Sequence, residues 1–162
     1  MAVDIVVNIQ GDEPLIQHSV IDQLVETLRD DAVAAVATPI RILKDKDKIN
    51  DPNVVKVVVD KDNYALYFSR SVIPCNRDQK SFTDGCYYQH LGLYAYRKEF
   101  LLEFVKLPKS FLEKAELLEQ LRVLEAGYKI KTVLTDVQAI SVDTEDDLLA
   151  VKKMVEKNEK HG

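Results

Sequence analysis

Two aspartates, Asp12 and Asp143, each come shortly after a short apolar segment and at the entry to a loop or a helix. If the two segments are neighbouring parallel strands, both carboxylates lie at the carboxyl edge of one sheet, where α/β folds bind ligands. Two carboxylates that face solvent suit Mg²⁺, because this ion keeps several water ligands and substrate phosphates complete its coordination shell. Asp12 can equally be a turn former and Asp143 a helix-start residue, because spacing along the chain does not show that the strands are adjacent.

Two arginines, Arg70 and Arg77, flank a short Val-Ile-Pro segment. Arg70 comes just past a predicted strand, and Arg77 follows a turn at the proline. Guanidinium groups placed in this way can clamp a carboxylate or a phosphate. Both residues can also be ordinary surface arginines.

His90 and Tyr94 belong to an aromatic, alternating stretch, YYQHLGLYAYR. The alternation predicts a strand, and its period of two sets both side chains on one face, opposite to Gln89. A strand face that carries His and Tyr can hydrogen-bond a polyol. The alternative is an ordinary amphipathic strand.

Charged and amide side chains recur along a predicted helix, namely Glu113, Glu116, Glu119, Gln120 and Arg122. Such a set usually forms a solvated helix face. Several of its members lie close to a stripe of leucines, which is unusual for a purely solvated set.

Composition limits the class of protein. The 162 residues are 46% hydrophobic and 30% charged, which suits one domain of ordinary size with a buried core. The net charge of -5 argues against a nucleic-acid partner, because no dense basic patch would neutralise phosphates. No apolar run approaches the ~20 residues of a membrane span, and no signal peptide is recognisable. Cys75 and Cys86 have no metal-binding spacing, so we expect free thiols and a cytoplasmic location.

The order of predicted elements indicates an α/β fold that occupies residues 1–162 as a single domain. We expect a mainly parallel sheet with antiparallel strands added in the middle, because strands and helices alternate at both ends of the chain. The expected strands are 3–9, 33–40, 54–60, 64–69, 87–97, 129–134 and 140–142, with a hairpin at 54–69. The expected helices are 19–28, capped by Ser19, then 98–106, then one from Ser110 to Gly127, and a last one from Asp143–Thr144 onward.

Five stretches occur here in the order that they take in one enzyme family. They are VVNIQGDEPLI, NDPNVVKVVVDKDNYALYFSRSVIP, QHLGLYAYR, LEKAELLEQLRVLEAGYKI and SVDTEDDLLAV. Together they make the chain resemble the CMP-Kdo synthetases, or 3-deoxy-manno-octulosonate cytidylyltransferases, over nearly its whole length.

The resemblance implies a Rossmann-like nucleotidyltransferase that is commonly a homodimer. Such an enzyme transfers CMP from CTP to the sugar acid Kdo, releasing pyrophosphate, for lipopolysaccharide biosynthesis. By resemblance, Asp12 and Asp143 are the catalytic Mg²⁺ ligands, and Gln10 lies where sugar and nucleotide meet. Arg70 holds the Kdo carboxylate with Arg77 nearby. The residues expected to bind sugar hydroxyls are His90, Tyr94, Glu119 and Gln120.

Family members also carry a glycine-rich, basic loop of the form PGKPL that holds the nucleotide, and this sequence contains no such loop. We therefore expect an N-terminally truncated, C-terminal portion of a family member, whose exposed sheet edge favours association. The alternative is a non-catalytic sugar-binding or dimerisation fragment of the same family. An enzyme for another nonulosonic acid is a third interpretation, against which the YFSR and LEQLR stretches speak.

Overall fold

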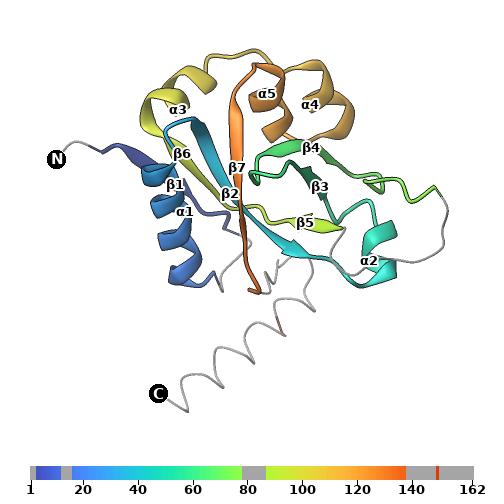
Figure 1. The fold of residues 1–162 in the computed structure, drawn as a ribbon. Helices are drawn as coiled ribbons and strands as arrows, with labels where there is room; N and C mark the ends of the chain where they lie inside the picture. Colours follow the sequence, from blue (N-terminus) through green and yellow to red (C-terminus); the bar gives the residue numbers. More distant parts are fainter. Residues whose placement is uncertain (1–2, 12–15, 78–86, 138–148, 150–162) are drawn as a thin grey trace, which may run out of the picture.

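A computed structural model describes residues 3–11, 16–77, 87–137 and 149. In these ranges a mixed sheet carries helices on both faces (Figure 1). Its strands are β1 (Ile5–Asn8), β2 (Ala34–Ile42), β3 (Lys56–Val59), β4 (Ala65–Ser69), β5 (Tyr88–His90), β6 (Tyr94–Arg97) and β7 (Lys129–Leu134). The helices are α1 (His18–Asp30), α2 (Lys46–Asn50), α3 (Lys98–Phe104), α4 (Phe111–Glu116) and α5 (Gln120–Glu125). In the described part of the chain, no helix is long and apolar enough to span a bilayer.

Strand β2 lies at the centre of the sheet. It pairs in parallel with β7 on one side, and antiparallel with β6 and then β5 on the other. Strand β1 lies outside β6, whereas the hairpin of β3 and β4 lies outside β5. The expected α/β class and the expected hairpin are therefore confirmed.

The balance of strand directions differs from the expectation of a mainly parallel sheet. Of the six strand pairings among the described residues, only that of β2 with β7 is parallel. Strands β1 and β2 do run in the same direction, as their helical crossover requires. They are not neighbours, however, because β6 lies between them and is antiparallel to both.

The aromatic stretch predicted as one strand is interrupted at residues 91–93, where it changes its outer partner from β3 to β1. Thr38 of the neighbouring β2 holds this interruption. Its hydroxyl donates to the carbonyl of Leu93 at 2.8 Å, and the amide of Leu91 donates to the carbonyl of Pro39 at 3.1 Å. The hydrogen bonds satisfy main-chain groups that the regular ladder would otherwise have paired.

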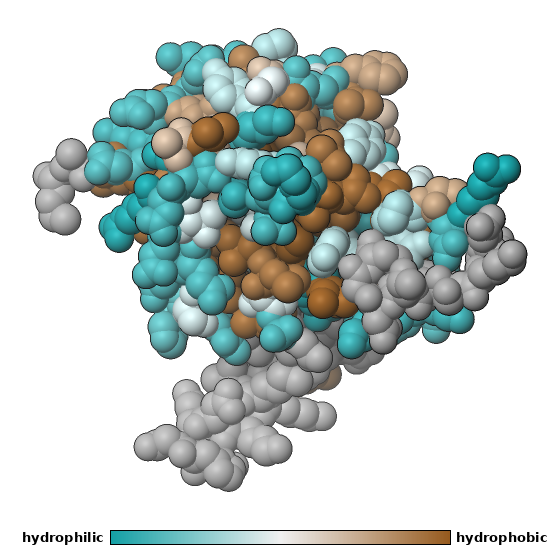
Figure 2. Space-filling view, in the orientation of Figure 1, coloured by the Kyte–Doolittle hydropathy of each residue, from teal (hydrophilic) through white to brown (hydrophobic). Residues whose placement is uncertain are grey.

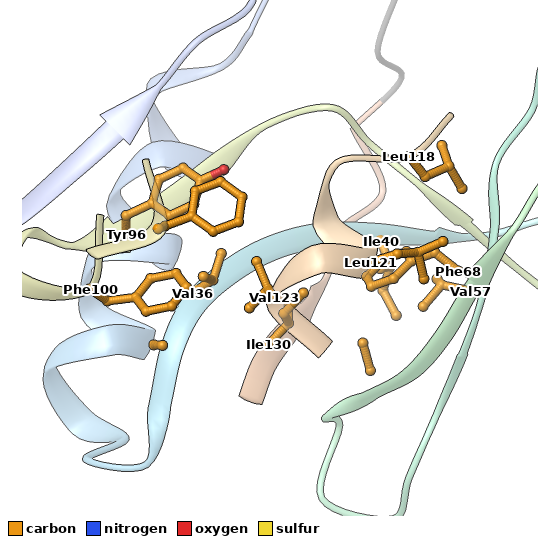
Figure 3. Packing of buried hydrophobic residues seen from close by; sticks show 13 residues of the cluster. Val36, Ile40, Val57, Phe68, Tyr96, Phe100, Leu118, Leu121, Val123 and Ile130 are labelled. Atoms are coloured by element: carbon orange, nitrogen blue, oxygen red, sulfur yellow. The ribbon is translucent and has the colours of Figure 1, made fainter. Parts of the chain in front are cut away.

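The two faces of the sheet bury different kinds of side chain. On one face, alanines of β2 and β6 allow Leu24 and Leu28 of α1 to pack closely. The other face carries a larger cluster beneath α3 and α5. Figure 3 shows this cluster extending from Phe100 and Tyr96 to Phe68 and Val57. In the view of Figure 2, hydrophilic residues cover the region of α1, and hydrophobic residues gather towards the middle of the molecule.

The helix expected from Ser110 to Gly127 is two helices. Its ends are as predicted: Ser110 and Glu113 form a capping box, and Gly127 has a positive φ of 83°. Between them, Leu117 adopts the left-handed conformation with φ 55° and ends α4. The reversal brings Glu113 against Arg122, so a tertiary ion pair overrides the local helical pattern.

Two other helix expectations need correction. Helix α1 begins at His18 after Gln17, so Ser19 lies inside the helix and does not cap it. The short helix α2 was not expected, although Asp45 accepts hydrogen bonds from two amides of its first turn. The helix expected from Asp143–Thr144 and the strand expected at 140–142 lie outside the described residues. Cys75 is an exposed free thiol, and Cys86 also lies outside the described residues.

Asp31 connects the end of α1 to the hairpin and to β7. Its Oδ1 accepts from the amides of Val33 and Ala34, both at 2.9 Å. Its Oδ2 accepts from the hydroxyl of Tyr64 at 2.6 Å and lies 3.2 Å from the ammonium of Lys131. Burial raises the pKa of Asp31, but these hydrogen bonds outweigh burial and lower its pKa from 3.8 to about 2.

We expect Asp31→Asn to lower the free energy of unfolding at pH 7 by about 2 kcal/mol. The folded pKa lies below the unfolded one, so the stabilisation is present above about pH 4 and is lost as the pH falls towards 2. Urea unfolding between pH 2 and pH 7 measures the effect, with the exposed Asp30→Asn as the control. A difference between wild type and Asp31→Asn that stayed constant down to pH 2 would contradict this assignment.

Candidate active site

The carboxyl ends of β1, β2 and β7 lie at one edge of the sheet. Strand β6 is antiparallel to both β1 and β2, and β7 is parallel to β2. In the register, Asn8 is opposite Tyr94, and Thr38 is opposite Thr132. Gln10, which is exposed and follows β1, therefore lies at the same edge of the sheet as the carboxyl end of β7.

Asp12 and Asp143 lie outside the described residues, so their proposed pairing stays a prediction. Asp12 follows Gln10 by two positions, and Asp143 follows β7 along the chain. The described residues that follow β1 and β7 leave the sheet at the same edge. Among the described residues alone, no three His, Cys, Asp or Glu side chains are grouped to hold a metal ion.

His90 and Tyr94 lie on one face, with ring centroids 5.3 Å apart. Phe68 of β4 also contacts the imidazole, in an edge-to-face arrangement with centroids 5.0 Å apart. His90 is only 8% exposed, and burial lowers its pKa to about 3, so the ring is neutral at physiological pH. This environment is apolar, as in most small-molecule sites, with few polar groups to orient a ligand.

The hydrogen bond between His90 and Thr38 assigns the imidazole tautomer. Nε2 of His90 lies 3.0 Å from Oγ1 of Thr38. Because the Thr38 hydroxyl gives its one hydrogen to main-chain oxygens, the shorter contact being to Leu93, Nε2 must be the donor. The proton therefore resides on Nε2, and Nδ1 is left as a hydrogen-bond acceptor.

Gln120, at the start of α5, is only 5% exposed. Its side-chain amide makes no hydrogen bond to any residue that the structure describes. Both flanking leucines, Leu118 and Leu121, pack in the same cluster as Phe68 and Tyr94. No side-chain nitrogen or oxygen that is buried in the described structure lacks a partner, so the amide atoms of Gln120 must reach the surface. An amide at the surface of an apolar cluster is a candidate for contact with a ligand.

Glu119, the neighbour of Gln120, has a different environment. Its side chain is 65% exposed and accepts from Nη2 of Arg122 at 3.1 Å. Glu119 lines a hollow of about 510 Å³ beside α4, together with Lys109 and Lys114, and Gln120 does not. The structure therefore does not bring Glu119 and Gln120 to one hollow, although both were expected to bind sugar hydroxyls.

Arg70, just past β4, is half-buried and firmly oriented. Its Nε donates to the main-chain carbonyl of Glu116 at 2.8 Å, and its Nη1 donates to the carbonyl of Pro52 at 3.0 Å. Both acceptors are neutral, so neither cancels the charge of the guanidinium. Arg77 is exposed and hydrogen-bonds none of the described residues, so the structure does not join it to Arg70.

Glu113 and Arg122, part of the predicted charged helix set, form a buried ion pair. Nε of Arg122 donates to Oε2 of Glu113 at 2.7 Å, and Nη2 donates to Oε1 at 2.8 Å. The hydrogen bonds from Arg122 lower the pKa of Glu113, and those to Glu113 raise the pKa of Arg122. The pair connects α4 to α5 and so fixes the helix that presents Gln120.

Comparison with known proteins identifies the family of this chain. A model of the family described as "Cytidylyltransferase" matches residues 1–130. The chain belongs to the cytidylyltransferase family. Within this family it is 45% identical to the 3-deoxy-manno-octulosonate cytidylyltransferase of Fusobacterium nucleatum, over 96% of this chain and 62% of that protein. It is 49% identical to the enzyme of the same name from Chloroherpeton thalassium, over 95% of this chain and 63% of that protein.

A solved structure extends the comparison to the fold. The structure of CMP:2-keto-3-deoxy-manno-octonic acid synthetase complexed with CTP superposes with a TM-score of 0.88 at 38% identity. The match covers 98% of this cytidylyltransferase chain and 64% of that chain. The present chain thus spans a little under two thirds of the length of these relatives.

Sequence reasoning missed two residues that shape the site of this cytidylyltransferase. Thr38 orients His90, and Lys56 is fully buried behind Arg70. A lysine inside the otherwise apolar run VVKVVV was the available signal for Lys56, because a lysine is almost never fully buried without partners. Thr38 had no such signal, since threonine is common in strands.

Proposed function

We propose that the protein transfers CMP from CTP to Kdo, forming CMP-Kdo and pyrophosphate, in lipopolysaccharide biosynthesis. The main support is identity of 45% and 49% to two relatives of that name, along nearly the whole of this chain. The solved structure of a similar synthetase with CTP supports the nucleotide.

In the proposed reaction, the anomeric hydroxyl of Kdo attacks the α-phosphorus of CTP. The new P–O bond forms as the bond to the β-phosphate oxygen breaks, the hydroxyl loses its proton, and pyrophosphate leaves. Both reactants are electron-rich, so the site must neutralise charge as the reaction proceeds. Arg70 would bind the sugar carboxylate, while His90, Tyr94 and Gln120 would orient the sugar. Gln10 would lie between the sugar and the nucleotide.

We propose Asp12 and Asp143 as the residues that hold Mg²⁺. Carboxylate oxygens are the ligands that this ion prefers, and the strands that precede the two aspartates along the chain, β1 and β7, both end at one edge of the sheet. When bound, the ion would offset negative charge on the phosphates. We also propose that the protein is a cytoplasmic homodimer. Light scattering tests the oligomeric state.

The decisive assay mixes the chain with CTP, Kdo and Mg²⁺ and measures pyrophosphate. We expect Kdo and Mg²⁺ to bind, and we expect pyrophosphate release that requires all three components and stops with EDTA once a nucleotide-holding loop of the PGKPL form is supplied. Kdo binding by calorimetry with no pyrophosphate release even in the presence of that loop would favour the sugar-binding fragment instead. If the protein shows no Kdo binding and no turnover, both proposals are rejected.

Gln120 offers a test of the sugar site that separates binding from stability. We expect Gln120→Leu to leave the free energy of unfolding unchanged or to raise it by up to about 1 kcal/mol, because leucine adds apolar contact beside Leu118 and Leu121 and no hydrogen bond to a described residue is lost. The same change should weaken Kdo binding about tenfold or more, through the loss of a hydrogen bond to the ligand.

Thermal unfolding and calorimetry measure the two effects of Gln120→Leu. The exposed Gln23→Leu on α1 is the matched control and should change neither. A large loss of stability in Gln120→Leu would show that the amide has a structural partner.

A further inference from the structure

Lys56 is a fully buried lysine whose ammonium contacts only neutral acceptors. Nζ donates to the main-chain carbonyls of Asp51 at 2.9 Å, Val54 at 2.6 Å and Arg70 at 2.5 Å. These three bonds use all three hydrogens of the ammonium. Burying a charge in this way costs several kcal/mol in desolvation, so stability alone does not account for a lysine here.

The three carbonyls belong to two separate segments that Lys56 joins. One is the turn at 51–54 before β3, and the other is the residue that follows β4. The carbonyl of Pro52, which lies between the two turn carbonyls bound by Lys56, accepts from Nη1 of Arg70. Lys56 therefore fixes both the main chain of Arg70 and the acceptor that aims its side chain.

Glu116, at the end of α4, also holds Arg70. Its carboxylate accepts from the hydroxyl of Ser69 at 2.7 Å and from the amide of Arg70 at 2.9 Å. Its main-chain carbonyl accepts from Nε of Arg70. Among the described residues nothing accepts from Nη2 of Arg70, so one edge of the guanidinium stays open.

We propose that Lys56 and Glu116 are positioning residues that set the open Nη edge of Arg70 to receive the carboxylate of the sugar acid. This inference deepens the proposed function and rests on it for the identity of the ligand. Two parallel hydrogen bonds from a guanidinium to a carboxylate need a fixed orientation, because both must align at once. A guanidinium held at two other N–H groups meets this need before the ligand arrives.

Positioning and simple charge attraction make opposite predictions for the two residues. Lys56→Met removes a positive charge near the carboxylate, whereas Glu116→Ala removes a negative one. If charge alone mattered, the first change would weaken Kdo binding and the second would strengthen it. If positioning matters, both changes weaken it.

The test compares binding of Kdo with binding of the derivative whose carboxylate is replaced by a hydroxymethyl group. We expect wild type to prefer Kdo by about 10- to 100-fold, which is the usual strength of hydrogen bonds to a charged group. In Lys56→Met and in Glu116→Ala the preference should fall to about 3-fold or less. Affinity for the hydroxymethyl derivative should not change. The exposed Lys61→Met, in the turn of the same hairpin, is the matched control and should retain the preference.

A second measurement needs no ligand. In wild type, the Nε–H of Arg70 should give a sharp, slowly exchanging NMR signal because it is bonded to Glu116. That signal should broaden or disappear in Lys56→Met. If Lys56→Met does not fold, Glu116→Ala decides the matter with the same two measurements.

The outcomes separate the two proposals. Wild type that does not bind Kdo would reject the proposed function, and the NMR signal would still decide whether Lys56 positions Arg70. Folded variants that keep both the preference and the NMR signal would overturn the positioning role. A stronger preference in Glu116→Ala would overturn it in favour of charge attraction.

Discussion

Replacing Arg122 by methionine should lower the free energy of unfolding by about 3–5 kcal/mol. The change leaves the carboxylate of Glu113 buried without its partner, since the Glu113 side chain is 8% exposed. It also removes the donor to the carbonyl of Leu107 and the cation that lies 4.5 Å from the ring centroid of Phe104. Few single changes in the described part of the chain break so many contacts between elements.

The double variant Glu113→Gln with Arg122→Met tests the cause. Glutamine is uncharged and can still complete the capping box with Ser110. We expect the double variant to be about 2 kcal/mol more stable than Arg122→Met alone, because no unpaired charge is buried. Urea unfolding measures all three proteins, with the exposed Lys114→Met as the control. If the double variant were as unstable as the single one, lost packing rather than a stranded charge would be the cause.

Asp12→Asn should reduce pyrophosphate release by about 10²- to 10³-fold, the usual effect of removing one group that stabilises developing charge. An amide is a weaker ligand for Mg²⁺ than a carboxylate, so the Mg²⁺ concentration that gives half-maximal rate should also rise. Asp143→Asn should behave in the same way. The assay varies Mg²⁺ at saturating CTP and Kdo.

A control for Asp12→Asn is available on α1, where Asp22 is exposed. Asp22→Asn should keep the wild-type rate and the wild-type Mg²⁺ requirement. Unchanged turnover in Asp12→Asn would return Asp12 to the role of a turn former. Reduced turnover with an unchanged Mg²⁺ requirement would place Asp12 at the substrate and not at the ion.

Sequence patterns predicted those features that local chemistry determines. The hairpin of β3 and β4, strand β7 and the capping box at Ser110 depend on residues close together in the chain. So does the positive φ of Gly127, which follows from the lack of a side chain. The alternating pattern also predicted that His90 and Tyr94 lie on one face of the sheet. They do so, because the interruption at residues 91–93 leaves both side chains on the same face.

Features that depend on distant partners escaped prediction. Leu117 has good helix propensity, yet it breaks the helix because Glu113 must meet Arg122. Gln120 and Glu119 carry similar local signals, although one is buried and the other exposed. Only the packing of α5 on the sheet separates their roles.

The placement of β6 between β1 and β2 was equally beyond local patterns. A helical crossover determines the direction of two strands but not whether a later strand will pair between them. The aromatic residues of β6 have high strand propensity, but propensity carries no information about partners. Strand order therefore depends on partners that are distant along the chain, which local patterns do not identify.

The central position of β2 has a consequence for how the chain is made. The ribosome completes β2 long before it adds Tyr96 or Ile130, both of which pair with Val36. Until the chain reaches β7, at least one edge of this apolar strand stays unpaired, and such segments are prone to aggregate during synthesis. Pairing across so many intervening residues also makes folding slow relative to a helical bundle. We therefore expect chaperones that shield this strand before β7 is added to raise the yield of native protein.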